Sequence, residues 1–287
     1  MTKKTKKVFG IGLVFLALCA VTACIMLRTP LTLVRYEVET DFTAPVRIVH
    51  LTDLHSWSHG ENNQELIQLV KEQSPDLILM TGDMMDREDE NPEVVCSLIS
   101  ALKDTAPVYF SYGNHEFQWM QRTGTDLRPI LTEAGATVLD IEYLDTEVNG
   151  QAVRLGGYYN YYYQPHMLIK DPEQIRAERA FGDDLKMTDR YIIFLNHIAT
   201  TWLDWNYRDD YSVDLVLTGH YHGGQVRLPF IGGLIAPYVG WFPEYTEGIY
   251  YGKKATVVLS TGLGSSPGIP RVNNPPQLVV VDLIPKT

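Results

Sequence analysis

The sequence predicts an α/β fold in which functional side chains lie at the C-terminal ends of neighbouring strands. Three short apolar runs, residues 46–51, 76–80 and 108–112, have the length and aliphatic content of buried strands. A polar loop follows each run, and a stretch with helical spacing comes after each loop. Strands that alternate with helices are typical of an α/β sheet, in which ligands bind beyond the carboxyl ends of the strands.

The same patterns place the other elements along the chain. Further strands are predicted at residues 31–39, as an edge strand, and at 137–141, 143–148, 152–156, 191–195, 213–218, 225–228, 256–260 and 278–283. Helices are predicted at residues 62–73, 92–102, 127–134 and 173–185. Residues 229–246, which include Trp241 and Phe242, are expected to be rich in loops.

Residues 1–28 are predicted to form a membrane anchor. A lysine cluster within residues 1–7 precedes residues 8–27, which contain no charged side chain. An apolar helix of that length spans roughly 30 Å, the thickness of a bilayer core. The basic flank is expected to stay in the cytoplasm, which places the rest of the chain outside the cell membrane in a single-pass topology. The alternative is a cleaved signal, in which residues 21–24 resemble a lipobox and Cys24 would be lipidated.

The chain beyond this segment is expected to be one domain. Residues 29–45 form a linker with an edge strand, and residues 46–284 form the main domain, because no repeat or low-complexity tract divides them. The formal net charge is −11, and residues 1–28 contain basic but no acidic side chains, so the domain is still more acidic than the whole chain. An acidic surface repels polyanions, so long nucleic acid is not expected as a partner.

Polar side chains follow five of the predicted strands. They are Asp53 and His55, Asp83 and Asp86, Asn114 and His115, His197, and His220 and His222. A single Asp after a strand is usually a turn or cap residue, and a single His is more often a satisfied interior group than a ligand. Five of the eight histidines fall on these strand ends together with acids and an amide, which turn chemistry does not explain. Oxygen donors mixed with imidazoles favour Mn²⁺, Zn²⁺ or Fe²⁺.

The His-x-His pair within residues 219–225 is the centre of this pattern. It follows the predicted strand 213–218 and is flanked by glycines, which allow tight turns. The segment is expected to be extended, so that His220 and His222 point to the same side, because side chains alternate along a strand. A His-x-His pair alone is more often a surface or core feature than a ligand pair, but the other four strand ends supply matching partners.

Taken together, these motifs resemble the calcineurin-like metallophosphoesterase superfamily. The blocks are Asp53-x-His55, Gly82-Asp83-x-x-Asp86, Gly113-Asn114-His115-Glu116, His197 and Gly219-His220-x-His222, in this order within residues 46–284. The resemblance implies a four-layer α/β sandwich of two mixed sheets with helices outside. Residues 223–225 and 228–233 resemble a membrane-anchored bacterial branch that includes UDP-2,3-diacylglucosamine pyrophosphatases.

The resemblance also implies roles for the strand-end residues. One divalent ion would be held by Asp53, His55 and His222, the second by Asn114, His197 and His220, and Asp83 would bridge both. His115 would stabilise or protonate the leaving oxygen, and Asp86 would orient a ligand histidine. His50, His59 and His166 match no block and are predicted to be structural.

The predicted activity is hydrolysis of a phosphoester or phosphoanhydride at the outer membrane face. Two cations about 3.5–4 Å apart neutralise the phosphate oxygens and generate the hydroxide that attacks phosphorus in line. The tether and the aromatic loops favour a lipid-linked or cell-wall-related substrate, and the tyrosine-rich residues 157–163 suit either a packed turn or a wall of the substrate pocket. The alternatives are a small-nucleotide or cyclic-nucleotide phosphodiesterase or nuclease, and a non-catalytic metal-bound surface protein.

Overall fold

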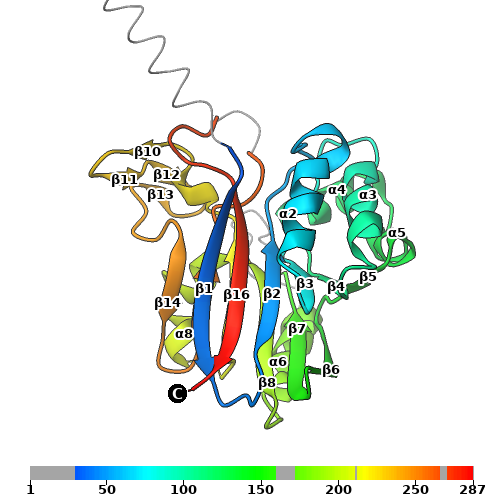
Figure 1. Cartoon of the computed structure of the whole chain (residues 1–287), viewed down its shortest axis with the longest axis vertical. Coiled ribbons are helices and arrows are strands. Elements are labelled where there is room, and N and C mark those ends of the chain that lie inside the picture. The colour runs from blue at the N-terminus through cyan, green and yellow to red at the C-terminus, as the bar shows by residue number, and fades with distance from the viewer. Residues whose placement is uncertain (1–29, 160–171, 211, 266–269, 287) are drawn as a thin grey trace, which may run out of the picture.

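The computed structural model describes residues 30–159, 172–210, 212–265 and 270–286 (Figure 1). The predicted anchor, His166 and most of the tyrosine-rich stretch lie outside the described residues. Within those ranges, no helix combines the length and the apolar character that crossing a bilayer requires.

Two six-stranded mixed sheets form the centre of the molecule. The first has the order β1 (Thr32–Thr40), β16 (Gln277–Pro285), β2 (Val46–Leu51), β3 (Leu77–Met80), β4 (Val108–Phe110) and β5 (Ala136–Val138). The second has the order β14 (Gly248–Tyr251), β15 (Thr256–Leu259), β9 (Leu215–Gly219), β8 (Tyr191–Ile198), β7 (Gln151–Gly157) and β6 (Glu142–Val148). The predicted pair of mixed sheets is confirmed. In the first sheet β16 runs antiparallel to β2, and in the second β14 and β6 are antiparallel edge strands.

The first sheet is buried on both faces, and each face packs in a separate core. Ile48 and Leu79 are fully buried against the second sheet, in a cluster that includes Leu217. Val49 and Met80, their neighbours in sequence, are fully buried on the opposite face against helices. Because successive side chains of a strand point to opposite faces, runs that are apolar throughout predict a sheet buried on both sides. Each such side chain contributes about 1.5–3 kcal/mol by burial.

Helices cover the outer faces of both sheets. Over the first sheet pack α2 (Gln64–Glu72), α3 (Glu93–Leu102), α4 (Asn114–Thr123) and α5 (Leu127–Ala134), as Figure 1 shows. The second sheet is covered by α6 (Pro172–Leu185) and α7 (Ala199–Trp202), and the short α8 (Tyr207–Asp210) follows. The predicted helix 62–73 opens with a 3-10 turn, Glu61–Asn63, before α2 begins.

Two parts of the chain differ from the predictions. Helix α4 is absent from the predicted elements, because Asn114 and His115 at its start belong to a polar loop in the sequence pattern. Gly113 is its N-cap, and the left-handed Gly124 (φ 68°) ends it. Residues 226–242, expected to hold one strand and then loops, form two small hairpins. They pair β10 (Arg227–Leu228) with β11 (Gly232–Gly233), and β12 (Ile235–Ala236) with β13 (Gly240–Trp241). Strands of two residues carry no periodic signal.

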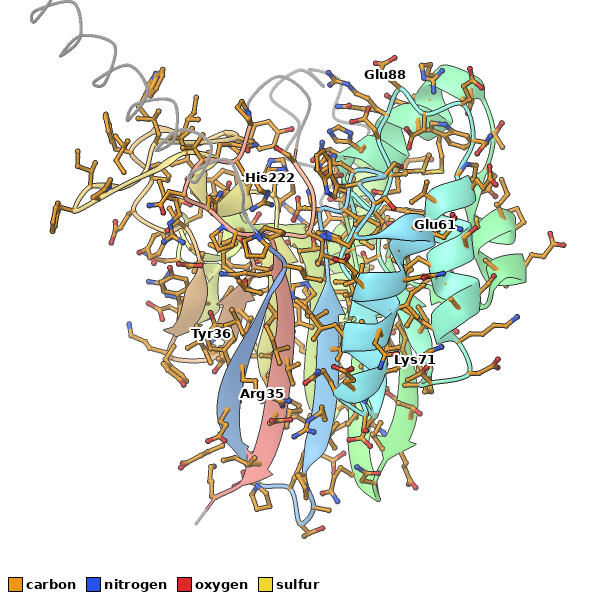
Figure 2. All side chains as sticks on the ribbon, turned by 45° about the horizontal axis from the view of Figure 1, so that its top comes forward. Arg35, Tyr36, Glu61, Lys71, Glu88 and His222 are labelled. Atoms are coloured by element: carbon orange, nitrogen blue, oxygen red, sulfur yellow. The ribbon has the colours of Figure 1, made fainter. Side chains whose placement is uncertain are left out.

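The parallel strands of both sheets point toward one end of the molecule, which positions the site. In the first sheet β2, β3 and β4 are parallel, and in the second β8 and β9 are parallel. In Figure 2, where this end is turned toward the viewer, His222 lies near the top, whereas Arg35 on β1 lies lower on the sheet.

Candidate metal centre

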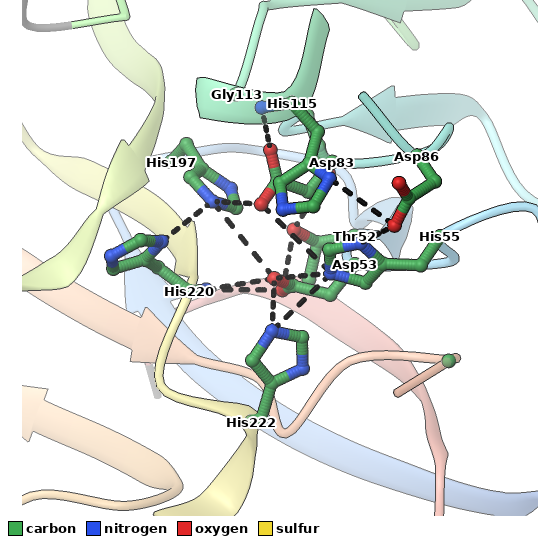
Figure 3. A network of polar contacts seen from close by, with 12 residues as sticks. Thr52, Asp53, His55, Asp83, Asp86, Gly113, His115, His197, His220 and His222 are labelled. Atoms are coloured by element: carbon green, nitrogen blue, oxygen red, sulfur yellow. Dashed lines mark hydrogen bonds and ion pairs between the residues drawn. The ribbon is translucent and has the colours of Figure 1, made fainter. Parts of the chain in front are cut away.

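Residues from five strand ends meet at this end of the two sheets (Figure 3). The loops after β2 and β3 are joined by backbone hydrogen bonds from Asp53 N to Gly82 O (3.0 Å) and from His55 N to Asp83 O (2.9 Å). The loop after β9 joins them, because His220 N donates to Asp53 Oδ2 (3.0 Å). Backbone hydrogen bonds therefore hold the first two loops together, and the Asp53 carboxylate ties the third loop to them.

The backbone at the site is left-handed at five predicted ligand positions. The φ angles of Asp53, His55, Asp83, His220 and His222 are 53°, 48°, 50°, 72° and 47°. Non-glycine residues with such angles cost of order 1–3 kcal/mol each and cluster at functional sites. The prediction that the His-x-His segment is extended is therefore wrong: β9 ends at Gly219, and the two histidines turn inward through positive φ angles.

One group of ligand atoms consists of Asp53 Oδ1, His55 Nε2 and His222 Nε2. His222 Nε2 lies 3.5 Å from Asp53 Oδ1 and 3.3 Å from His55 Nε2. His55 Nε2 lies 4.0 Å from Asp53 Oδ1. The three side chains are buried and can each offer one atom to a common cation. They are the residues predicted to hold the first ion.

A second group consists of Asp83 Oδ2, His197 Nε2 and His220 Nδ1. His197 Nε2 lies 3.1 Å from Asp83 Oδ2 and 3.0 Å from His220 Nδ1. Asp83 Oδ2 is also 3.9 Å from His55 Nε2 of the first group. Asp83 thus lies between the two groups, where a carboxylate that bridges two cations has to lie.

The donor set fits divalent transition metals on grounds of geometry. His197 Nδ1 donates to the backbone oxygen of Thr81 (2.9 Å), which leaves Nε2 as the atom that faces Asp83. A ring N–H bound to a carbonyl is the usual way in which a protein orients a metal-binding histidine. Asn114 Oδ1 is buried without a hydrogen-bond donor among the described residues, so a cation would satisfy it. The ligand roles of the seven residues remain predictions.

His115 and Asp86 lie beside the two groups. His115 Nδ1 accepts a hydrogen bond from Arg87 N (3.1 Å) and lies 3.5 Å from Asp86 Oδ2. The His115 and His55 rings meet edge to face, with centroids 4.4 Å apart. Asp86 Oδ2 is 3.9 Å from His55 Nδ1, which is too long for a hydrogen bond, so Asp86 acts on that ring through its charge.

Comparison with known proteins identifies the family. A family model described as calcineurin-like phosphoesterase matches residues 46–224, more than half of the chain. The chain belongs to the calcineurin-like phosphoesterases. It is therefore a metallophosphoesterase, a hydrolase. Two bacterial relatives and one solved structure illustrate the likeness.

The uncharacterized metallophosphoesterase YkoQ of Bacillus subtilis is 27% identical over 236 residues, which cover 81% of this chain and 82% of the relative. Phosphodiesterase YaeI of Escherichia coli is 27% identical over 85% of this chain and 84% of the relative. The solved NAD nucleotidase of Haemophilus influenzae has a TM-score of 0.49 at 16% identity, and the match covers 76% of this chain and 45% of that one.

Glu116 belongs to one of the five motifs of this phosphoesterase but has no role among the predictions. The carboxylate of Glu116 is buried and accepts hydrogen bonds from Asp83 N (2.8 Å), Met84 N (2.8 Å) and Gly113 N (2.9 Å). It ties the loop after β3 to the start of α4. The signal that could have identified it is the spacing Gly-x-x-Glu, in which the third helical residue returns to the N-cap.

Two histidines that match no motif lie outside the ligand groups. His50 Nε2 pairs with Thr81 Oγ1 (2.7 Å) and His59 Nε2 with the backbone oxygen of Leu263 (2.8 Å). Both are buried, as expected of structural histidines.

Proposed function

We propose that this phosphoesterase holds two divalent cations and hydrolyses a phosphodiester or phosphoanhydride at the outer face of a membrane. The observation that carries the dinuclear part is the position of Asp83 Oδ2, 3.1 Å from His197 Nε2 and 3.9 Å from His55 Nε2. A single carboxylate oxygen within reach of two imidazole groups suits a pair of cations that share one ligand.

The protein supplies charge and orientation around those cations. When bound, the cations would neutralise phosphate oxygens and lower the pKa of water. Asp53 and Asp83 contribute negative charge, while burial keeps His55 neutral. Two divalent ions exceed the charge of these carboxylates, so the centre attracts a phosphate although the chain has a net charge of −11.

His115 is the proton donor in this proposal. Its Nδ1 accepts from Arg87 N, which places the ring proton of the neutral imidazole on Nε2. Burial lowers the pKa of His115, but the carboxylates of Asp83 and Asp86 outweigh burial and the pKa lies above its ordinary value. In the charged ring that acts as the acid both nitrogens carry protons, so Nδ1 faces Asp86 Oδ2, 3.5 Å away, in place of the bond from Arg87 N, and Nε2 can protonate the oxygen that leaves phosphorus.

Two observations support the membrane location and the diester class. Residues 8–27 carry no charge and follow a lysine cluster, which is the pattern of a single-pass anchor. The relative YaeI is named a phosphodiesterase. The finer proposal, a lipid-linked or cell-wall-related substrate such as a nucleotide-sugar lipid pyrophosphate, rests on the tether and the exposed aromatic loops.

The test is turnover by the purified full chain with Mn²⁺ and with a chelator. The panel contains an aryl phosphodiester, an aryl phosphomonoester, a cyclic nucleotide and a nucleotide-sugar lipid pyrophosphate. Asp83→Asn keeps the size of the side chain and an oxygen for the bond from His115 N, but removes the bridging charge. We expect its metal-dependent turnover to fall at least ~100-fold. The matched control is Asp145→Asn, because Asp145 lies on β6 and pairs with Arg154 of β7, away from the centre.

Normal turnover by Asp83→Asn, or equal turnover with and without chelator, would contradict the dinuclear mechanism. Preference for the cyclic nucleotide over the lipid pyrophosphate would favour the small-nucleotide alternative instead.

A further inference from the structure

The two small hairpins, residues 226–242, form an apolar projection that we call the hairpin lobe. No residue from position 228 to 243 is charged, in a chain with a net charge of −11. Phe230 is fully exposed, and Ile231, Trp241 and Phe242 expose 62%, 66% and 59% of their surface. Large apolar side chains that gather on a surface mark contact with another apolar body.

The backbone of the lobe is strained where it displays these side chains. Ile231 N donates to Leu228 O (3.2 Å) and closes a turn with Pro229 second and Phe230 third. Phe230 has a φ of 66°, a value that this turn position usually reserves for glycine. Phe242 has a φ of 56°. A strained aromatic side chain that is fully exposed to water does not stabilise the fold, so we attribute Phe230 to contact with another body.

The lobe lies beside the start of the described chain. Arg227 N donates to Val272 O (2.9 Å), and Thr32 N donates to Pro276 O (2.9 Å), so the base of the lobe and the first residue of β1 flank the same short segment. Figure 1 shows β10–β13 at the end of the molecule where β1 begins. The five Cα–Cα steps from Leu27 to Thr32 can span at most about 18 Å. A bilayer that holds residues 8–27 is therefore close to the lobe.

The lobe is also joined to the metal centre. Tyr238, in the turn between β12 and β13, stacks on the ring of His220 with centroids 4.9 Å apart and planes inclined by 27°. Leu234 N donates to Gly224 O (3.1 Å), in the motif that carries the histidines. The lobe is thus attached to the metal centre, and a surface that holds the lobe also sets the orientation of the centre relative to that surface.

We propose that the hairpin lobe is an anchor in the membrane interface. The side chains of Phe230, Ile231 and Trp241 enter the boundary between headgroups and acyl chains, about 5–10 Å deep, and hold the metal centre at the level of the lipid phosphates. A bilayer fits the lobe better than a protein partner does, because protein interfaces have a polar rim and the lobe has no charged side chain between positions 228 and 243. Aromatic residues are enriched at membrane interfaces. This inference rests on the proposed membrane location.

The test is the depth of a spin label on the full chain in vesicles of phosphatidylcholine and phosphatidylglycerol. The three native cysteines are replaced by alanine, and the label is placed at Phe230→Cys or, at the same turn, Ile231→Cys. Met187→Cys is the control, because Met187 is an exposed apolar residue (74%) that precedes β8 at the opposite end of the sheets. Metal-dependent hydrolysis of a water-soluble aryl phosphodiester checks that each labelled chain is folded.

We expect the labels at 230 and 231 to be accessible to oxygen and at least ~5-fold less accessible to a water-soluble nickel chelate than the label at 187. Equal exposure to nickel at 230 and 187 would overturn the anchor while leaving the tether intact. Shielding of 230 from both reagents would show a protein contact instead. Failure of both the native chain, which retains Cys24, and the labelled chains to float with the vesicles would refute both the tether and the anchor.

Discussion

Burial and neighbouring charge decide which side chains of the centre have a lone pair to offer. Burial lowers the pKa of His55 to about 3 and moves the pKa of His220 well below its ordinary value, so both are neutral at pH 7. His197 differs: burial lowers its pKa, but the negative charges of Asp83 and Asp53 outweigh burial and raise the pKa to about 9. In the metal-free protein this imidazole is therefore protonated at neutral pH.

Metal binding should release the proton of His197. Only the neutral ring can bind a cation, so the apparent affinity for Mn²⁺ should rise about tenfold per pH unit from pH 7 and level off near pH 9. Calorimetry in two buffers with different ionisation enthalpies measures the released proton. A pH-independent affinity between 7 and 9, with no proton released, would refute this expectation.

His115→Asn should separate the leaving-group step from metal binding. The variant loses the proton donor but none of the seven predicted ligands, so the bound metal should be unchanged. We expect kcat to fall ~10²–10⁴-fold for a diester with an alkoxide leaving group and much less for one that releases nitrophenolate. Steady-state rates on both substrates, with metal analysis of the same samples, provide the measurement. Equal losses on the two substrates would rule out the proton-donor role.

At the scale of elements, the end of β9 lies so close to the loop after β2 that only glycine fits at its last residue. A Cβ at Gly219, the last residue of β9, would overlap Asp53 Oδ2 and Thr52 Oγ1. The same closeness lets His220 N reach the carboxylate of Asp53. The glycine before the histidine motif is thus part of how Asp53 is held.

Gly219→Ala should therefore displace the Asp53 carboxylate and weaken the first ligand group. We expect a loss of bound metal and at least a ~100-fold loss of turnover, with circular dichroism close to that of the unmodified chain. The control is Gly124→Ala, in which the new Cβ meets nothing within 4 Å although φ is 68°; it should lose some stability but keep its metal. Full metal content in Gly219→Ala would contradict the steric argument.

Long apolar runs predict the central strands, whereas the two-residue strands of the hairpin lobe and helix α4 are absent from the predicted elements. The predicted strand 46–51 coincides with β2, and the predicted helix 127–134 coincides with α5. Helix α4 was missed because Asn114 and His115 serve the site from its first turn and conceal its amphipathic pattern. The spacing Gly-x-x-Glu indicates the bond from Gly113 N to Glu116, but no local pattern records the bonds from Asp83 N and Met84 N, about thirty residues away in sequence.

At the scale of the molecule, the centre joins the two sheets at one end, beyond the apolar cluster of Ile48, Leu79 and Leu217 that packs between them. Asp53 and Asp83 extend from the first sheet, and His197 and His220 from the second. Cations shared by both sets would cross-link the sheets, and their loss would leave buried carboxylates close together with strained backbone around them.

Removing the metal should therefore lower the thermal stability of the whole domain. With free Mn²⁺ at about 1,000 times Kd, binding adds about 4 kcal/mol, which corresponds to roughly 8–16 °C in Tm for a domain of this size. Scanning calorimetry of the full chain with Mn²⁺ and with a chelator measures the shift. Asp83→Asn should show a much smaller shift, and an equal shift in that variant would mean that the stabilising metal binds elsewhere.

The sequence by itself indicated the chemistry of this protein through five motifs in order, the apolar strands before them, and an acidic character with which long nucleic acid is not an expected partner. These properties are local, so residue type and period reveal them. The tertiary structure alone decided that β1 pairs with β16, more than two hundred residues away, that five predicted ligand positions have left-handed backbone, and that the hairpin lobe lies beside the centre. These properties depend on contacts between distant segments, and packing, which local periodicity does not record, selects them.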